Sequence, residues 1–305
     1  MTGYAVVFPG QGSQFAGMAD PWAAHPASRA VLEEASEAMG RDVVAGCRDE
    51  AALATTAFVQ PALLAIGVAG FAVLEAEGMP LPVGAAGHSL GEFAALVAAG
   101  VLTLSEGLDV VVVRGAAMQR AGQERPGTMA ALLGVGPEDA EALCDDARGD
   151  DVLLVANLNS PVQVVISGGV DAVARAEALA KERKVRAVRL NVAGAFHSPL
   201  MEPAVSVIDE RVDALPFREP RFPVAENVTG ALVTDAEELR ALLKRHVVSP
   251  VRWEACARAL AGAGAQVFVE PGAGDILTKL QKRIDQDVRA VAVGSPEAAR
   301  AALAG

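Results

Sequence analysis

The sequence contains little cysteine: three residues in a chain of 305, far apart and odd in number. This usage argues against a disulfide framework and is typical of a reducing compartment. Residues 1–8 carry no basic segment and resemble a β-strand, so we expect no signal peptide and a cytoplasmic protein. The longest apolar stretch, residues 61–74, is shorter than a bilayer-spanning helix and predicts a buried helix instead.

Basic residues are also scarce. Lysine and arginine total 26 against 38 acidic residues, which gives a formal net charge of −12. This charge disfavours nucleic-acid binding as the main function, because phosphate contacts need cations. It would also repel an acidic partner unless a local basic patch offsets it. With 52% hydrophobic residues, the chain can bury a large core in one large domain or two.

The sequence does contain a G-x-S-x-G element, Gly87–Gly91, with Ser89 at its centre. Small apolar residues lead into it from Val83 and an apolar helix-like run follows, which is the context that a nucleophile elbow requires. The turn would expose the serine hydroxyl, and the helix N-terminus behind it would favour developing negative charge. The pattern predicts an ester on Ser89. A capping box formed by Ser89 and Glu92 accounts for the same residues without chemistry.

A serine nucleophile needs a base, and the chain has only four histidines. The ring of His88, inside the elbow, would point away from Ser89, while His25 and His246 lie in polar stretches that suggest surface or structural roles. His197 lies in a loop of small residues between an expected strand and an expected helix, where scaffolds often place catalytic groups. We therefore predict a dyad of Ser89 and His197.

No acidic residue is clearly placed as the third member of a triad. The acids between Ser89 and His197 cluster where surface helices and helix caps are expected, whereas α/β-hydrolases place their third member in that interval. We expect another group, such as a backbone carbonyl, to orient the imidazole.

Arg114 and Gln11 are unusual for their surroundings. Arg114 follows four valines in an apolar helical setting, where an arginine extends to the surface, pairs with an acid or holds a substrate carboxylate. Gln11 lies in a glycine-rich loop after the first strand. That loop lacks the third glycine and the lysine of nucleotide-binding loops, but its backbone N–H groups can stabilise an oxyanion.

The pattern changes between residues 127 and 192. Strands are expected at Met129–Val135, Val152–Ala156, Val162–Ser167 and Val185–Val192, with helices at Pro137–Ala147 and Asp171–Arg183. This βαββαβ order is that of a ferredoxin-like unit. We predict a small subdomain at 127–192, inserted into a larger α/β subdomain formed by 1–126 and 193–305, with a ligand cleft between them.

In the larger part, Tyr4–Phe8 predicts a strand. Pro61 predicts the start of a helix that stops at Gly78, and Ser105 predicts the cap of a further helix.

Together these residues resemble a known family. Their motifs occur in the order found in malonyl-CoA:acyl-carrier-protein transacylases, the acyltransferases of fatty acid and polyketide synthesis: Pro9–Gln14, Gln60–Ala62, Gly87–Glu92, Arg114-Gly115, Asn159–Pro161, Phe196–Ser198 and Pro250–Trp253. The resemblance covers nearly the whole chain. It implies a hydrolase-like α/β subdomain with a parallel sheet and a ferredoxin-like insertion, in agreement with the predicted organisation.

The resemblance also implies roles for single residues. Ser89 would be the nucleophile and His197 the base and then the acid. Arg114 would hold the free carboxylate of a malonyl group, and the backbone N–H groups of Gln11 and Leu90 would form the oxyanion hole.

Two further roles follow from the same resemblance. A main-chain carbonyl near Pro250–Trp253 would orient the histidine, which gives Ser249 a supporting role in place of the family's usual asparagine. Phe196 would leave no room for a methyl group on the acyl α-carbon and so favour malonyl over methylmalonyl units.

The implied reaction is ping-pong transfer of malonyl from coenzyme A to the phosphopantetheine thiol of an acyl carrier protein, with no permanently bound cofactor and no metal. Docking of an acidic carrier needs cations, and two clusters offer them: Lys279, Lys282 and Arg283, or the basic residues between Lys181 and Arg189. The alternatives are a polyketide acyltransferase with another acyl unit, a serine esterase or thioesterase, and a non-catalytic scaffold.

Overall fold

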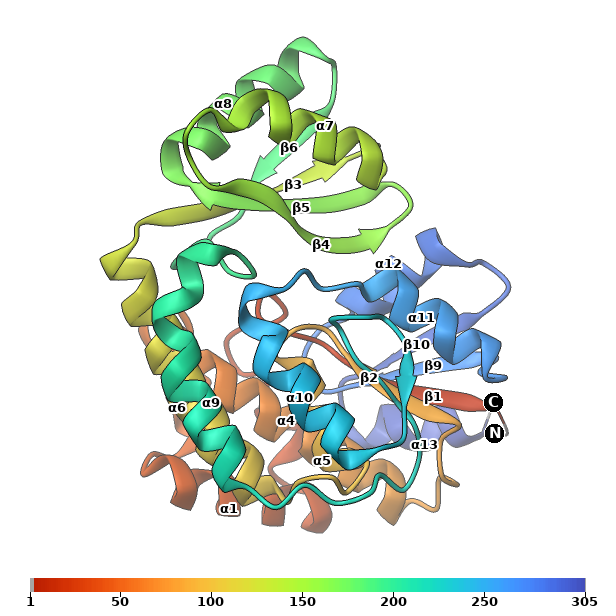
Figure 1. Cartoon of the computed structure of the whole chain (residues 1–305). Helices are drawn as coiled ribbons and strands as arrows, with labels where there is room; N and C mark the ends of the chain where they lie inside the picture. The colour runs from red at the N-terminus through yellow and green to blue at the C-terminus, as the bar shows by residue number, and fades with distance from the viewer. Residues whose placement is uncertain (1–2, 305) are drawn as a thin grey trace.

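The computed structural model describes residues 3–304, and its strands form two separate sheets. In Figure 1 the smaller sheet (green) lies above the larger part of the molecule, with helices on its outer face. The predicted fold class, a parallel-sheet α/β part with a ferredoxin-like insertion, is confirmed. The exact boundaries at 126/127 and 192/193 stay a prediction.

The larger sheet has six strands in the order β10-β9-β1-β2-β7-β8, and each neighbouring pair is parallel except β7 with β8. Its strands are β1 (Tyr4–Phe8), β2 (Gly84–Gly87), β7 (Val224–Ala225), β8 (Leu232–Val233), β9 (Val267–Pro271) and β10 (Arg289–Val293). Parallel strands buried on both faces are expected to be short continuous apolar runs, and β1 is fully buried along its length.

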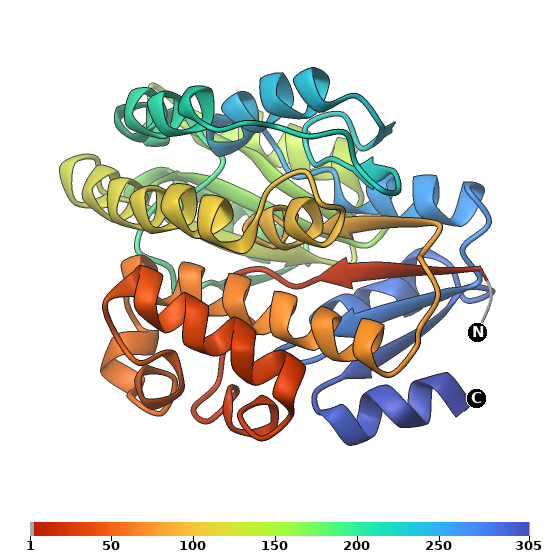
Figure 2. The same ribbon diagram turned by 90° about the horizontal axis from the view of Figure 1, so that it is seen from below.

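Helices cover both faces of this sheet because successive side chains of β1 point to opposite sides. Tyr4, Val6 and Phe8 join a core with α1 (Pro26–Met39), α4 (Thr56–Ala76), α5 (Gly91–Ala98), α6 (Leu104–Glu124) and α13 (Pro296–Ala304). Ala5 and Val7 pack against α11 (Trp253–Gly262) and α12 (Ile276–Ile284). Figure 2 shows α1, α4 and α13 on one side of the sheet. The remaining helices are α2 (Val43–Gly46), α3 (Glu50–Leu53), α9 (Glu202–Ala214) and α10 (Ala236–Arg245).

Helix α4 begins earlier than the sequence suggested. Pro61 lies inside it, five residues after its start at Thr56, so the prediction that Pro61 opens the helix was wrong. The proline removes one intrahelical hydrogen bond near the N-terminus, and burial of nearly every residue of the helix outweighs that loss. At 21 residues, α4 is long and apolar enough to cross a membrane by composition alone, but it lies in the core of the structure.

The cap of α6 also differs from the prediction. Thr103, not Ser105, is the N-cap: its hydroxyl accepts from the Glu106 N–H at 3.2 Å, and the Glu106 carboxylate accepts from the Thr103 N–H at 2.7 Å. This reciprocal capping box satisfies two backbone donors at once, which a cap at Ser105 could not do with the same partner.

The smaller sheet is antiparallel, in the order β4-β5-β3-β6. Its elements are β3 (Gly127–Leu133), α7 (Pro137–Arg148), β4 (Leu153–Ser160), β5 (Gln163–Gly169), α8 (Val170–Glu182) and β6 (Arg186–Arg189). The face carrying Leu132 and Ile166 packs on α7 and α8. Met129 and Val165, on the opposite face, join the core of the larger part. The small sheet therefore covers the part of the molecule that holds Ser89.

Candidate active site

Ser89 lies two residues after the end of β2, at the carboxyl end of the parallel sheet. Its φ of 50° is in the left-handed region, which costs a non-glycine residue about 1–2 kcal/mol. Among residues 3–304, only Lys184 and His197 are other non-glycine residues with positive φ, and His197 has a φ of 57°. Strained backbone of this kind concentrates at functional sites, so both members of the predicted dyad have a conformation that packing alone does not require.

The two glycines of the element are required by close approach of the backbone. A Cβ atom on Gly87 would lie 1.8 Å from the carbonyl carbon of Gly91, and one on Gly91 would lie 2.1 Å from the carbonyl oxygen of Phe8. The capping-box explanation does not account for these contacts, because a helix cap needs no glycine at either position. The tight turn of an elbow does require them.

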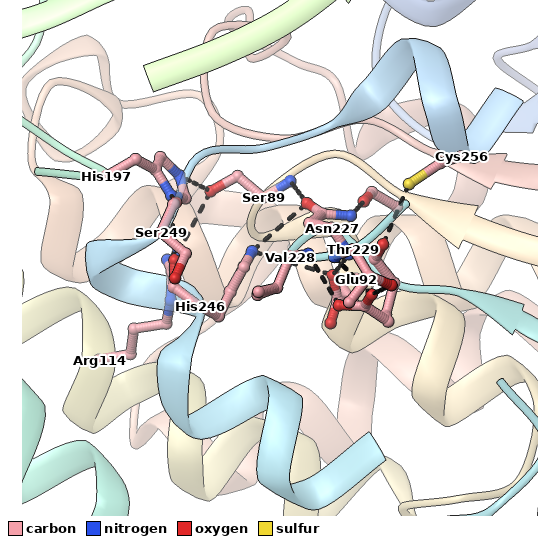
Figure 3. Close-up of polar contacts among 12 residues, drawn as sticks. Ser89, Glu92, Arg114, His197, Asn227, Val228, Thr229, His246, Ser249 and Cys256 are labelled. Carbon is pink, nitrogen blue, oxygen red and sulfur yellow. Dashed lines mark hydrogen bonds and ion pairs between the residues drawn. The ribbon is translucent and has the colours of Figure 1, made fainter. Parts of the chain in front are cut away.

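The side chains of Ser89 and His197 meet although 108 residues separate them, with Oγ 2.7 Å from Nε2 (Figure 3). The other ring nitrogen, Nδ1, lies 3.1 Å from the carbonyl oxygen of His246 and 3.0 Å from that of Ser249. Carbonyl oxygens only accept, so Nδ1 must carry the hydrogen. Nε2 is then left free to accept the hydroxyl proton of Ser89.

The carbonyl of Ser249 is held in place by the small sheet. Val251, two residues on, donates its N–H to the Ala156 carbonyl at 2.8 Å and accepts from the Leu158 N–H at 2.8 Å. These bonds pair the segment around Val251 with β4. The backbone that orients His197 is therefore held by the small sheet as well as by the larger subdomain. A backbone carbonyl occupies the position that an acid would have in a triad.

His246 lies beside the dyad, whereas its polar surroundings in the sequence suggested a surface or structural role. It is buried, its carbonyl contacts His197, and its ring lies 5.4 Å from the His197 ring in an edge-on arrangement. The polar sequence around it gave a misleading signal, because the short helical turn at residues 246–248 directs the side chain inward.

Burial lowers the pKa of His197 to about 3, and the positive charge of Arg114 and the neighbouring His88 act in the same direction. The carbonyl hydrogen bonds to Ser249 and His246 oppose the shift but do not cancel it. The imidazole is therefore neutral at physiological pH, which is the protonation state that a general base requires.

This lowered pKa predicts how acylation depends on pH. A histidine with a pKa of 6.5 would lose its base form about 25-fold between pH 7 and pH 5, whereas His197 should keep it above about pH 4. We expect the rate at which an activated acyl group is transferred to Ser89 to change less than about threefold over that range. Rapid-quench mass spectrometry of the intact protein measures it. A more than tenfold loss with a midpoint near pH 6.5 would contradict the prediction.

Arg114 is fully buried, and its side chain extends toward Ser89 and His197 (Figure 3). One guanidinium nitrogen, Nη1, donates to Gln60 Oε1 at 2.5 Å, and Nη2 lies 3.3 Å from Ser89 Oγ. Burial lowers its pKa to about 10, so it remains charged at neutral pH. Glu92 raises the pKa of Arg114 in opposition to burial, but burial holds the Glu92 carboxyl largely protonated, with a pKa of about 8. Within residues 3–304 Arg114 forms no ion pair shorter than 4.0 Å. A buried charge without a counterion is costly, and an anionic ligand would supply the missing partner.

Two cavities lie at the dyad and share lining residues, among them Gln11 and His88. The inner one, about 70 Å³, is lined by Gln60, Met118, Met129, Phe196 and the dyad itself. An outer one, about 440 Å³, continues from His88 between the small sheet and α12. The inner cavity admits only a small acyl group, and the outer one has room for a longer chain.

Gln11 and Leu90 both line the inner cavity, as an oxyanion hole requires. Leu90 is the N-cap of α5, and within the described chain neither backbone N–H has a hydrogen-bond acceptor. Free donors beside a serine nucleophile suit a developing oxyanion. The ring of His88 is directed away from Ser89, as expected: its Nε2 lies 2.8 Å from Asn159 Oδ1.

Gln60 and Asn227 are site residues for which no role was expected from the sequence. A signal for Gln60 was available, since it is a single polar residue in the apolar run of α4. Asn227 follows the short strand β7 and accepts a hydrogen bond from the Ser89 N–H at 2.7 Å. Its polar neighbours resemble an ordinary loop, so only the fold reveals this contact.

A strained serine at the end of a parallel sheet, with a neutral imidazole on its hydroxyl, defines a class of protein. It is the arrangement of enzymes that pass an acyl group through a serine ester. The covalent chemistry is shared by hydrolases and transferases. The buried arginine distinguishes this site from a simple esterase.

Comparisons with known proteins identify the family. The family model described as "Acyl transferase domain" matches residues 5–300. The malonyl CoA-acyl carrier protein transacylase of Escherichia coli strain K12 is 39% identical over 307 residues, covering 99% of each chain. That of Bacillus subtilis strain 168 is 36% identical, covering 99% of this chain and 97% of its own. The chain belongs to the acyl transferase family.

Solved structures agree with this assignment. The crystal structure of malonyl-CoA:acyl carrier protein transacylase from Xanthomonas oryzae has a TM-score of 0.95 and 41% identity, covering 100% of this chain and 98% of its own. A malonyl-transacylase in complex with its type II polyketide synthase acyl-carrier protein also has a TM-score of 0.95, with 37% identity and 99% of each chain covered.

Proposed function

We propose that this protein transfers malonyl groups from coenzyme A to the phosphopantetheine thiol of an acyl carrier protein. The observation that carries the proposal is the buried Arg114 guanidinium beside the dyad of Ser89 and His197, which forms no ion pair within residues 3–304. It selects an acyl group that ends in a carboxylate. The names of the relatives support the same substrate and acceptor.

In the first half-reaction the thioester carbonyl of malonyl-CoA lies against Ser89. Oγ attacks the carbonyl carbon as His197 Nε2 accepts its proton. The backbone N–H groups of Gln11 and Leu90 stabilise the oxyanion. When the tetrahedral intermediate collapses, the carbon–sulfur bond breaks and coenzyme A leaves with the proton from His197. The product is a malonyl ester on Ser89.

In the second half-reaction the carrier's thiol takes the place of coenzyme A in the outer cavity. His197, neutral again, accepts the thiol proton as sulfur attacks the ester, and then returns that proton to Ser89 Oγ. Arg114 and Gln60 hold the malonyl carboxylate through both steps. A bidentate guanidinium fixes both the charge and the orientation of the acyl group.

A labelling experiment tests this function. The protein is incubated with malonyl-CoA labelled in the malonyl group, separated from free ligand and mixed with a holo acyl carrier protein. We expect label first on a peptide containing Ser89 and then on the carrier. Label released to water instead would identify a thioesterase, and no label would identify a non-catalytic scaffold.

Phe196 directly precedes the base and lines the inner cavity, with 7% of its surface exposed. We expect Phe196→Ser to raise the rate of methylmalonyl transfer relative to malonyl transfer by about 10- to 100-fold, because one methyl group in a pocket is worth about 1–3 kcal/mol. Competition between the two acyl-CoA substrates measures this ratio. An unchanged ratio would show that Phe196 only packs against the core.

The carrier's docking surface is inferred from the position of the outer cavity. Ile276 and Leu280 of α12 line that cavity, and Arg283 hydrogen-bonds to Gln163 across it. We infer that the acidic carrier binds the α12 cluster of Lys279, Lys282 and Arg283. Both basic clusters contain paired cations, Lys279 with Asp275 in α12 and Arg183 with Asp146 in the alternative run. The position of α12 beside the outer cavity therefore favours the α12 cluster.

We also propose that the protein acts in the cytoplasm, in fatty acid or polyketide synthesis. The three cysteines are free thiols buried in the fold, which suits a reducing compartment.

A further inference from the structure

The back of the nucleophile elbow is held by a single side-chain amide. Asn227 Oδ1 accepts from the Ser89 N–H at 2.7 Å, and Asn227 Nδ2 donates to the Gly87 carbonyl at 2.7 Å. Figure 3 shows Asn227 on the side of Ser89 opposite His197. One carboxamide therefore satisfies two backbone groups on either side of residue 88, at the point where the chain turns most sharply.

The position of Asn227 follows from the sheet. β7 pairs with β2 through Ala85 with Val224 and Ala86 with Ala225, and the pairing ends there. A carboxamide carries the same donor and acceptor as a peptide group. The Asn227 side chain thus extends the hydrogen bonding of β7 beyond its last paired residue. It reaches the sharp turn at Ser89, where regular strand pairing has ended.

The same amide contacts the support of the base. His246 Nε2 lies 3.3 Å from Asn227 Oδ1, and the main-chain carbonyl of His246 accepts from His197 Nδ1. Oδ1 has two lone pairs, so it can accept from both Ser89 and His246. The chain of contacts from Ser89 through Asn227 and His246 to His197 joins the nucleophile to its base behind the reaction centre.

Asn227 is itself fixed within this buried cluster. It is fully buried, and its own N–H donates to the Glu92 carboxyl at 2.9 Å. Burial, with the neighbouring Glu226, raises the pKa of Glu92 to about 8. Burial and the charge of Arg114 keep the pKa of His246 well below its usual value, so its ring is neutral. Glu92 and His246, two side chains in contact with Asn227, are thus largely uncharged and contact it through hydrogen bonds.

We propose that Asn227 is a positioning residue that holds the Ser89 turn in its strained conformation. It thereby keeps the Ser89 hydroxyl within hydrogen-bond distance of His197 Nε2. This role rests on the proposed function, since it assumes that Ser89 is the nucleophile. It predicts an effect on the rate of the chemical step and not on substrate binding, because Asn227 lies behind the elbow and lines neither cavity.

The test is Asn227→Ala, which removes both hydrogen bonds to the elbow. We expect single-turnover acylation of Ser89 by malonyl-CoA to fall about 100-fold, because a displacement of about 1 Å can cost that much. The KM for malonyl-CoA should change less than about threefold. Asn227→Asp keeps the shape and the acceptor for the Ser89 N–H but loses the donor to the Gly87 carbonyl. Its acylation rate should therefore lie between those of the parent protein and Asn227→Ala.

Ser28→Ala is the matched control. Ser28 is fully buried and its hydroxyl donates to the carbonyls of Trp22 and His25, far from the elbow in the fold. It should lower the melting temperature without changing acylation. If Asn227→Ala, corrected for its folded fraction, acylates within threefold of the parent protein, or if its loss lies in KM, the proposal is overturned.

The labelling of Ser89 by a fluorophosphonate provides a second measurement that does not depend on malonyl-CoA. We expect the same order of rates: parent, then Asn227→Asp, then Asn227→Ala. A parent protein that reacts with the fluorophosphonate but not with malonyl-CoA would overturn the proposed function and leave the role of Asn227 measurable. Equal labelling of all three proteins would overturn that role alone.

Discussion

Replacing Ser89 by alanine should lower malonyl transfer by about 10⁴- to 10⁶-fold, the range seen when the nucleophile of a serine dyad or triad is removed. The loss is large because no other hydroxyl shares the contact with His197 Nε2 in the structure. The substituted protein should also fold as the parent does, since alanine removes one oxygen from the cavity wall. Transfer to a holo carrier protein measures the loss of activity, and the mass of the intact protein after incubation with malonyl-CoA shows whether an ester forms. The melting temperature, compared with that of the parent protein, checks the fold.

Ser13→Ala is the matched control for this result. Ser13, in the glycine-rich loop, is also buried near the site, and its hydroxyl donates to the Gly10 carbonyl at 2.9 Å. Ser13→Ala should still accept the malonyl label, because Ser13 contacts no base. If Ser89→Ala gains the mass of a malonyl group, the ester forms elsewhere and the mechanism fails at its first step.

Replacing Arg114 by alanine should separate malonyl from acetyl transfer. Loss of one partner from a buried charge pair costs about 2–5 kcal/mol, or about 30- to 3,000-fold in rate. Acetyl transfer should change less than about tenfold, because an acetyl group has no carboxylate for the guanidinium to hold. Rates with malonyl-CoA and acetyl-CoA, measured on the same preparation, give the ratio directly.

Arg120 provides the matched control, since it lies on the same helix and is exposed. Arg120→Ala should leave the ratio of malonyl to acetyl transfer unchanged. Arg114→Lys should recover part of the malonyl rate, because it keeps the charge but loses the two-point fork. Equal losses for both acyl groups in Arg114→Ala would show that the arginine supports the fold and does not select the substrate.

Much of the fold could be predicted from local patterns. The βαββαβ order of the small subdomain was readable because each strand and helix has its own period and the turns carry proline and glycine. Ends of elements were less certain: Pro61 and Ser105 are good helix starters that the chain uses inside helices, at Thr56–Ala76 and Leu104–Glu124. In both cases contacts made after folding outweigh the local preference.

The dyad could also be predicted, because an elbow has a sequence signature and few histidines competed for the role of base. Gln60, Asn227 and His246 could not. Each is a polar residue whose position depends on which elements lie beside it, and no spacing along the chain encodes that.

The sequence alone indicates the type of chemistry: a serine at a sharp turn that requires glycines, and a histidine able to act as its base. The groups that surround this pair could not be read from the sequence. Folding buries Arg114 with no ion pair within residues 3–304, directs two carbonyls toward His197 and places Asn227 behind Ser89. A turn is a local property of the backbone, whereas burial and hydrogen-bond partners exist only once distant segments have packed together.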